Sequence, residues 1–436
     1  MGRGRHFFTT FIDYFLDNFQ MTDSEDKQSP YAALKYPQFV AFIFANSFFT
    51  IAILIQEVVL GYSIYKITHD PLALGFIGLA EALPYISLAL FGGHLADRRD
   101  KKTLMQVSLL FIIMGSLVLI WATSSTSGLT QSQMLTVIYS VVMLIGFSRG
   151  FYSPASGSLN PFLIPKEVFA NGATWQSSFW QAGAILGPGF AGFMYAYLGL
   201  TVTLWIVVGI FALVMLLLST ITSPPIPVQN SQKVNIFESL REGIAYVFGT
   251  KVILYSISLD LFSVLFGGVI ALLPIYSEDI LHVGAKGLGI LRAAPSVGAV
   301  LTMLIMVYFP PLNHAWRNLL LAITGFGIAT LVFAVSTNIW LSAGALFLTG
   351  AFDSVSVIIR QTVIRFFTPD EMRGRVSSVN GIFVSSSNEL GAFESGLAAK
   401  LMGTVPSVIF GGAMTMIIVT IVWFRSKELF NLKFDK

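Results

Sequence analysis

The 436-residue sequence contains no cysteine, which excludes disulfides, thiolate metal sites and cysteine nucleophiles. Its five histidines are scattered without the spacing of metal ligands. No Ser-His-Asp pattern and no glycine-rich loop ending in Gly-Lys-Ser/Thr is present, which argues against hydrolytic catalysis and against ATP-driven work within this chain. We therefore expect no enzyme activity, no metal or other cofactor, and no nucleic-acid partner.

Charged residues are also scarce, at 11% of the chain against roughly 25% in an ordinary soluble domain. Hydrophobic residues make up 55% and fall in blocks of about 20 or more, long enough to cross a hydrocarbon core as helices. The blocks are continuous and lack the alternation of barrel strands, so an outer-membrane barrel is rejected. This pattern predicts an all-α integral membrane protein in contact with the lipid bilayer.

Twelve transmembrane helices are expected. Their predicted limits are 38–65, 71–93, 103–123, 132–156, 168–198, 200–222, 252–276, 286–309, 317–336, 338–361, 374–400 and 404–424.

The 26 Lys and Arg residues are distributed unevenly between the two sides of these spans. Only Lys66, Lys286 and Lys400 fall in loops on one side. Arg149, Arg292 and Arg360 lie within spans, and every other cation falls on the side that holds both termini. Because cytoplasmic loops carry the excess of cations, both termini are predicted to be cytoplasmic. We expect the membrane to be a bacterial inner membrane.

The longest interior connection divides the chain into two halves. It contains three prolines and an amphipathic stretch at 236–248. We expect a cytoplasmic N-terminal segment (1–36), a six-helix bundle (37–222), a cytoplasmic linker (223–251), a second six-helix bundle (252–425) and a cytoplasmic tail (426–436). In the N-terminal segment an apolar stripe is interrupted by Asp13 and Asp17, and either an interfacial helix or a natural translation start at Met21 explains it.

The two halves are predicted to be parallel copies. At an offset of 204 positions Gly187, Gly192 and Gly199 coincide with glycines, and at an offset of 211 Tyr65 and Pro84 coincide with Tyr276 and Pro295. Both offsets keep the order and orientation of the helices, as internal repeats of transporters do. The halves should therefore form two pseudo-symmetric bundles.

A cation-rich stretch follows the second predicted span and runs from Gly93 to Lys102. It resembles the loop motif of the major facilitator superfamily, except that Asp100 replaces its second glycine. The resemblance implies a cytoplasmic gate made of Gly93, Asp97, Arg98, Lys101 and Lys102. An ordinary loop that only sets topology is the alternative.

The fifth predicted span resembles the superfamily's exporter-associated motif at Gly183, Gly187, Pro188 and Gly192. Proline removes a backbone hydrogen bond and small residues let helices approach closely, so we expect a helix bend at a packed seam. Simple packing of small residues is the alternative.

Further stretches, at 287–295, 369–376 and 388–391, are similar to the branch of that superfamily that includes enterobactin exporters and macrolide efflux proteins. The resemblance implies the major facilitator fold and export of a small molecule, a siderophore or drug-like compound, by antiport with protons. We also expect the chain to function as a monomer. An importer or a lipid flippase of the same fold is the alternative.

Nine ionisable residues lie within the predicted spans, and each costs roughly 3 kcal/mol at a helix centre in lipid. Most must therefore pair or face a watery cavity. The proton-coupling candidates are Asp260, Glu389, Glu57 and Asp353. The substrate-cavity candidates are Glu81, Arg149, Arg292, Asn388, Glu394, Phe262 and Trp180.

The repeat relates Arg149 to Asp353 and Glu81 to Arg292, which suggests opposite charges on two facing walls. For each charged residue, a structural ion pair or a side chain reaching toward the membrane surface is the alternative. For the two aromatic residues, it is a position facing lipid.

Overall fold

The computed structural model describes residues 29–124, 126–223, 236–311 and 313–431. The predicted N-terminal stripe lies outside the described residues. In chain order the helices are η2 (Ala32–Lys35), α2 (Pro37–Thr68), α3 (Pro71–Arg98), α4 (Lys101–Ala122), α5 (Gln131–Leu159), η3 (Asn160–Phe162), η4 (Lys166–Val168), α6 (Phe169–Thr220), α7 (Ile236–Gly249), α8 (Lys251–Phe266), η5 (Val269–Leu272), α9 (Leu273–Ile275), η6 (Tyr276–Ile280), α10 (Gly284–Tyr308), α11 (Ala315–Val335), α12 (Ile339–Phe367), η7 (Asp370–Met372), α13 (Arg373–Met402), α14 (Thr404–Arg425) and η8 (Lys427–Asn431).

The prediction of an all-helical membrane protein with twelve crossings is confirmed. Ten described segments are long and apolar enough to span a membrane. One of them, α6, contributes two crossings, because its path is broken at Gly199, which has φ 75°. The more polar α13 supplies the remaining crossing.

Helix ends follow local sequence signals. Pro37 and Pro71 open α2 and α3, where a missing N–H costs nothing. The Asp70 side chain caps α3 by accepting the Leu72 N–H, and Asp100 caps α4 in the same way through Lys102. The departure of Asp100 from the loop motif therefore has a local role, since it starts the next helix.

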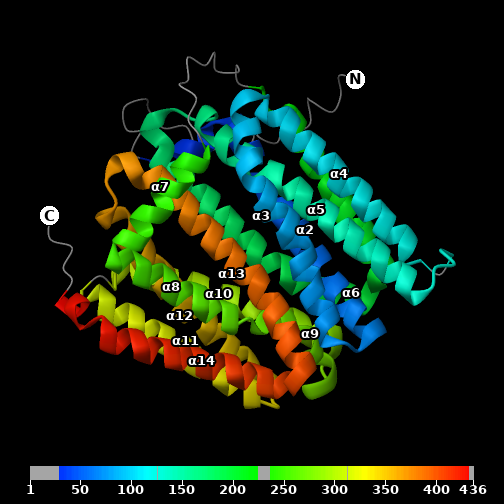
Figure 1. Ribbon diagram of the computed structural model, residues 1–436. Helices are drawn as coiled ribbons and strands as arrows, with labels where there is room; N and C mark the ends of the chain where they lie inside the picture. The colour runs from blue at the N-terminus through cyan, green and yellow to red at the C-terminus, as the bar shows by residue number, and fades with distance from the viewer. Residues whose placement is uncertain (1–28, 125, 224–235, 312, 432–436) are drawn as a thin grey trace.

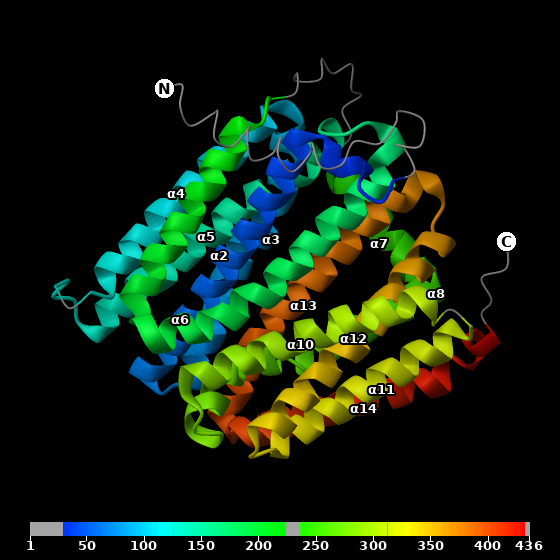
Figure 2. The same ribbon diagram turned by 180° about the vertical axis from the view of Figure 1, so that it is seen from behind.

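The helices form two bundles, seen on opposite sides of the molecule in Figures 1 and 2. In the N-terminal bundle α2 packs on α6 and α5 packs on α3 and α4. In the C-terminal bundle α12 packs on α10 and α11, and α8 packs on α13 and α14. The bundles meet where α3 lies along α13 and α6 lies along α10.

Glycines permit the closest approaches between the bundles. A Cβ at Gly192 would lie 2.3 Å from the carbonyl oxygen of Ala285, and one at Gly396 would lie 2.9 Å from the Gly75 backbone. These crossings lie at one end of the molecule, which we name the closed end. The opposite end holds Tyr36 and Arg425. Toward the other end, the termini end, the two groups of helices diverge (Figures 1 and 2).

Two segments add detail to the predicted organisation. The stretch predicted as a linker contains α7 at the position of the amphipathic stretch, and α7 packs on the second bundle: Glu242 pairs with Arg375, and the Tyr246 hydroxyl donates to the carbonyl oxygen of Phe367. The seventh crossing is interrupted after Phe266 and resumes as η5, α9 and the π-helix η6. Gly268 lies at the interruption, where its backbone passes close to Gly391 of α13.

Candidate functional site

Five ionisable side chains gather where the two bundles meet, near the middle of their helices. This bridging cluster consists of Glu57 on α2, Glu81 on α3, Arg149 on α5, Arg292 on α10 and Glu389 on α13. Within the first bundle Arg149 forms an ion pair with Glu81. Across the bundles the Arg292 guanidinium lies 3.1 Å from the Glu57 carboxylate. The cluster therefore links the bundles by charge as well as by packing.

Glu389 is the member of the bridging cluster without a direct partner. Within the described chain it forms no ion pair or hydrogen bond, but it interacts electrostatically with the other four members. Its carboxylate packs on α3, where a Cβ at Gly78 would lie 3.3 Å from Oε2. This glycine lets α13 come close enough for the carboxylate to reach the cluster.

The formal charge of the bridging cluster decides what it can bind. Three carboxylates and two guanidinium groups leave one negative charge when all are ionised. An uncompensated charge at this depth is costly, so the cluster is suited to hold one proton or one positive group. The small cavity beside it has a volume of about 20 Å³, enough for a water but not for an organic molecule. Its lining residues are Ile53, Gln56, Glu57, Leu60, Ile77, Glu81, Val142 and Ile145.

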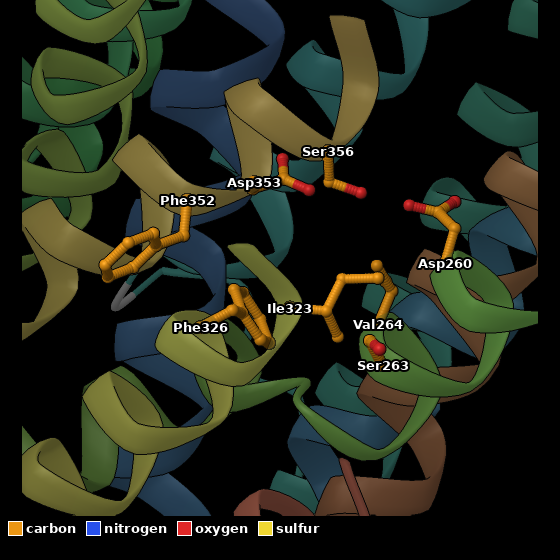
Figure 3. A pocket seen from close by; sticks show the side chains of 8 residues that line it. All are labelled: Asp260, Ser263, Val264, Ile323, Phe326, Phe352, Asp353 and Ser356. Carbon is orange, nitrogen blue, oxygen red and sulfur yellow. The ribbon is translucent and has the colours of Figure 1, made fainter. Parts of the chain in front are cut away.

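A second group of charges lies inside the C-terminal bundle, between α8, α11 and α12. Asp260 of α8 pairs with Arg360 of α12, and both side chains are almost fully buried. On the same helix as Arg360, Asp353 of α12 lines a cavity together with Asp260, Ser263 and Ser356, as Figure 3 shows. We name this space the C-bundle cavity; its remaining lining residues are Val264, Ile323, Phe326 and Phe352.

The structure arranges the charged residues differently from the facing walls that the repeat suggests. Arg149 pairs with Glu81 of its own bundle rather than facing Asp353. Arg292 pairs with Glu57 rather than with Glu81. Asp260 and Glu389, both proton-coupling candidates, lie in separate groups.

The other substrate-cavity candidates lie outside these two charged groups. Trp180 is exposed on α6, and Phe262 is exposed on α8, where it stacks on Phe266. Asn388 is exposed and donates to the carbonyl oxygen of Val384 on its own helix. Glu394 is half-buried on α13.

The gate candidates are described only in part. The side chains of Gly93, Asp97 and Arg98 lie outside the described part of the structure. Lys102 donates to the carbonyl oxygens of Ser219 and Ile221, at 3.0 and 2.6 Å, where a cation is favoured at the C-terminal end of α6. Lys101 is buried, with its ammonium group over the ring of Phe162. Both lysines thus contact the N-terminal bundle.

The residues of the expected helix bend form a packed seam. Gly183 and Gly187 pack on α2, where a Cβ at Gly187 would lie 3.0 Å from Leu54, and Gly192 packs on α10. Helix α6 continues through Pro188 without leaving helical geometry, and its positive φ occurs later, at Gly199.

A set of polar contacts at the closed end was not foreseen from the sequence. The Tyr62 hydroxyl donates to Glu278 at 2.5 Å, the Tyr65 hydroxyl donates to Asp279, and Lys66 lies 3.7 Å from Glu278. These contacts join α2 to the π-helix η6, so they cross between the bundles. The sequence shows two tyrosines near the end of α2 and two adjacent acids in η6, but it does not show that they meet.

A second interbundle contact at the closed end joins α3 to α13. The Lys400 ammonium lies 2.7 Å from the Asp70 carboxylate. We name these contacts together the closed-end latch: Tyr62, Tyr65, Lys66, Asp70, Glu278, Asp279 and Lys400.

Comparison with known proteins gives a consistent result. The family described as "Transmembrane secretion effector" matches residues 28–432. Macrolide efflux protein A of Streptococcus pyogenes is 24% identical over 395 residues, covering 86% of this chain and 92% of that protein. Enterobactin exporter EntS of Salmonella typhi is 23% identical over 392 residues, covering 88% of this chain and 91% of that protein.

Solved structures share the fold. The crystal structure of nucleoside transporter NupG superposes with a TM-score of 0.67 at 11% identity, covering 91% of this chain and 100% of that chain. The D-xylose-proton symporter superposes with a TM-score of 0.68 at 12% identity, covering 89% of this chain and 97% of that chain. Both have the fold of the major facilitator superfamily.

Proposed function

The chain belongs to the transmembrane secretion effector family of the major facilitator superfamily, and on this basis we propose that it exports a small amphipathic molecule in exchange for protons. It is a multi-pass membrane transporter and not an enzyme. We place it in a bacterial inner membrane with both termini in the cytoplasm, acting as a monomer on a siderophore or drug-like compound.

The bridging cluster is the observation that carries this proposal. The pair of Glu57 and Arg292 joins the bundles, and Glu389 contributes the negative charge that has no partner. A proton on Glu389 neutralises the cluster and lets the bundles stay together at this level. When the proton leaves, the extra charge favours a water-filled arrangement that a cationic or polar group of the substrate can enter.

The arrangement of the two ends fits one step of an alternating-access cycle. With the termini in the cytoplasm, the closed end faces outward and the diverging end faces the cytoplasm. In this state the site exchanges protons and substrate with the cytoplasm. A proton entering down a membrane potential of 100 mV supplies about 2.3 kcal/mol for the return step.

The exposed aromatic residues Trp180 and Phe262 are proposed to contact the apolar part of the substrate. The names of the two curated relatives supply the first compounds to test, a macrolide and enterobactin.

The direct test is accumulation of labelled compounds in inverted membrane vesicles energised by a proton gradient, with Glu389→Gln beside the natural chain. We expect the natural chain to accumulate at least one compound, and Glu389→Gln to fall to the level of vesicles that lack the chain. Its matched control is Glu371→Gln, the same change at an exposed position after α12. This control should transport normally.

Three results would overturn the proposal. Unchanged gradient-driven accumulation by Glu389→Gln would remove the assigned coupling residue. Gradient-driven uptake into right-side-out vesicles would identify an importer, and lipid movement without a gradient would identify a flippase.

A further inference from the structure

The C-bundle cavity contains polar atoms without partners. Within the described chain, Asp353 forms no ion pair or hydrogen bond. The Ser263 hydroxyl, on a side chain only 5% exposed, also lacks a hydrogen-bond partner. Figure 3 shows Asp353 and Ser356 on α12 facing Asp260 on α8 across this space. Because buried polar groups are normally satisfied, the buried Ser263 hydroxyl points to an occupant, and the half-buried Asp353 carboxylate, which also lines the cavity, supplies a charge for it.

The size of the cavity restricts that occupant. Its volume is about 10 Å³, which admits a single particle of the size of a water molecule. An organic substrate does not fit. The cavity also lies within one bundle, between α8, α11 and α12, whereas the bridging cluster lies between the bundles.

The charge of the surrounding residues further restricts the occupant. Asp260 is neutralised by Arg360, so Asp353 leaves the group with one uncompensated negative charge. The residues that the cavity draws from α11, Ile323 and Phe326, are not ionisable. The oxygen ligands available are the Asp353 carboxylate and the hydroxyls of Ser263 and Ser356, a set that suits a proton or a hard cation and not a soft metal.

We propose that the C-bundle cavity is a second cation site of this transporter, which takes one monovalent cation: a proton on Asp353, or Na⁺ held by Asp353, Ser263 and Ser356. Occupancy neutralises the charge on α12 and lets it pack against α8. Together with the proposed function, the site has one consequence: each transport cycle moves a second positive charge in addition to the one on Glu389. Only this consequence rests on the proposed function.

Binding is tested on the purified full-length chain, without a transported substrate. Potentiometric titration counts the protons bound per molecule at neutral pH, where an ordinary aspartate holds none, and radioactive sodium measures Na⁺ binding, for the natural chain, Asp353→Asn, Ser263→Ala and Glu389→Gln. Ser354→Ala is the matched control, because Ser354 is equally buried on α12 but bonds to the Ala351 carbonyl oxygen and does not line the cavity.

If the cation is a proton, Asp353→Asn binds one proton fewer than the natural chain and neither binds Na⁺. If it is Na⁺, the natural chain binds one ion per molecule, Asp353→Asn binds none, Ser263→Ala binds more weakly, and Ser354→Ala binds normally. In both cases Glu389→Gln retains the C-bundle site even though it loses transport. Each of these results supports the site.

Equal proton counts for the natural chain and Asp353→Asn, together with no Na⁺ binding, would overturn the proposal and leave only water in the cavity. If Asp353→Asn does not fold, a hydrophobic carbodiimide offers a second measurement on the natural chain. It should modify a protonated Asp353, as located by mass spectrometry, or Na⁺ should bind. The absence of both would also overturn the site, and neither result bears on Glu389.

Discussion

At the scale of single residues, the chain places each intramembrane arginine next to one acid. The pair of Asp260 and Arg360 is the most enclosed, with side chains 7% and 5% exposed. Removing one partner of a buried pair leaves an uncompensated buried charge, whereas replacing both partners with apolar residues leaves no charge to compensate. The stability of the C-terminal bundle should therefore depend on the pair more than on either residue.

This argument predicts a strongly non-additive double-mutant cycle. Arg360→Leu should lower the free energy of unfolding by about 3–5 kcal/mol, because Asp260 is left charged and unpaired. Adding Asp260→Leu should recover most of that loss. Thermal unfolding of the purified variants measures both effects, and two losses that simply add would show that the pair is not coupled.

Sequence reasoning could find these charges but not their partners. Asp260, Arg360, Glu389 and the other intramembrane ionisable residues stand out because charge is rare in apolar spans. Which acid meets which arginine depends on the rotation of each helix about its axis, and a span that is apolar on all sides carries little information about that rotation. The position of Asp353 beside a cavity was hidden for the same reason.

At the scale of elements, glycine and proline determine where helices begin, break and touch. Gly199 and Gly403 both have positive φ and end the fifth and eleventh crossings, as their offset of 204 positions suggests. The interruption of the seventh crossing at Gly267 and Gly268 was not predicted, because two glycines within an apolar span are also common in continuous helices. That interruption positions η6 at the closed end.

The crossing of α6 and α10 gives a prediction at this scale. Gly192→Ala should force the two helices apart, because its Cβ would lie 2.3 Å from the carbonyl oxygen of Ala285. Gly209→Ala in the same helix is the control, because its added Cβ would have no neighbouring atom within 4 Å. With Ile77→Cys as reporter in this cysteine-free chain, labelling from the closed end should rise in Gly192→Ala only. Equal labelling in both variants would show that the crossing does not seal that end.

At the scale of the whole molecule, two bundles close on each other at one end through glycine crossings and the closed-end latch. The number of crossings, their limits and the internal repeat were predictable, because hydropathy, charge bias and self-similarity report on them directly. Which end is closed was not predictable, since both conformations of an alternating transporter bury similar residues. The latch contacts between α2 and η6 hold the two bundles together at this end.

The latch has a predictable pH dependence. Burial raises the pKa of Asp70, but the hydrogen bonds from Lys400 and from the Leu72 N–H outweigh it and hold that pKa below its ordinary value. The contact therefore stabilises the closed end above the ordinary aspartate pKa of about 3.9 and is lost as pH falls through the lowered value.

The contribution of this contact to short spin-label distances across the closed end should consequently persist at neutral pH and be lost only in strong acid. In Lys400→Gln the closed population should already be smaller at neutral pH. Equal closed populations of the natural chain and Lys400→Gln at neutral pH would contradict this assignment, because the ion pair would then not hold the closed end.

The central claim is that transport requires the closed end to open and close. It is tested most directly by a disulfide between Gly189→Cys and Ala293→Cys, because a Cβ at Gly189 lies 3.6 Å from that of Ala293, within the range of a disulfide. The chain has no other cysteine, so the cross-link is unambiguous. Gradient-driven efflux should stop on oxidation and return on reduction, with both single-cysteine variants unaffected. Full efflux by the cross-linked protein would contradict the account.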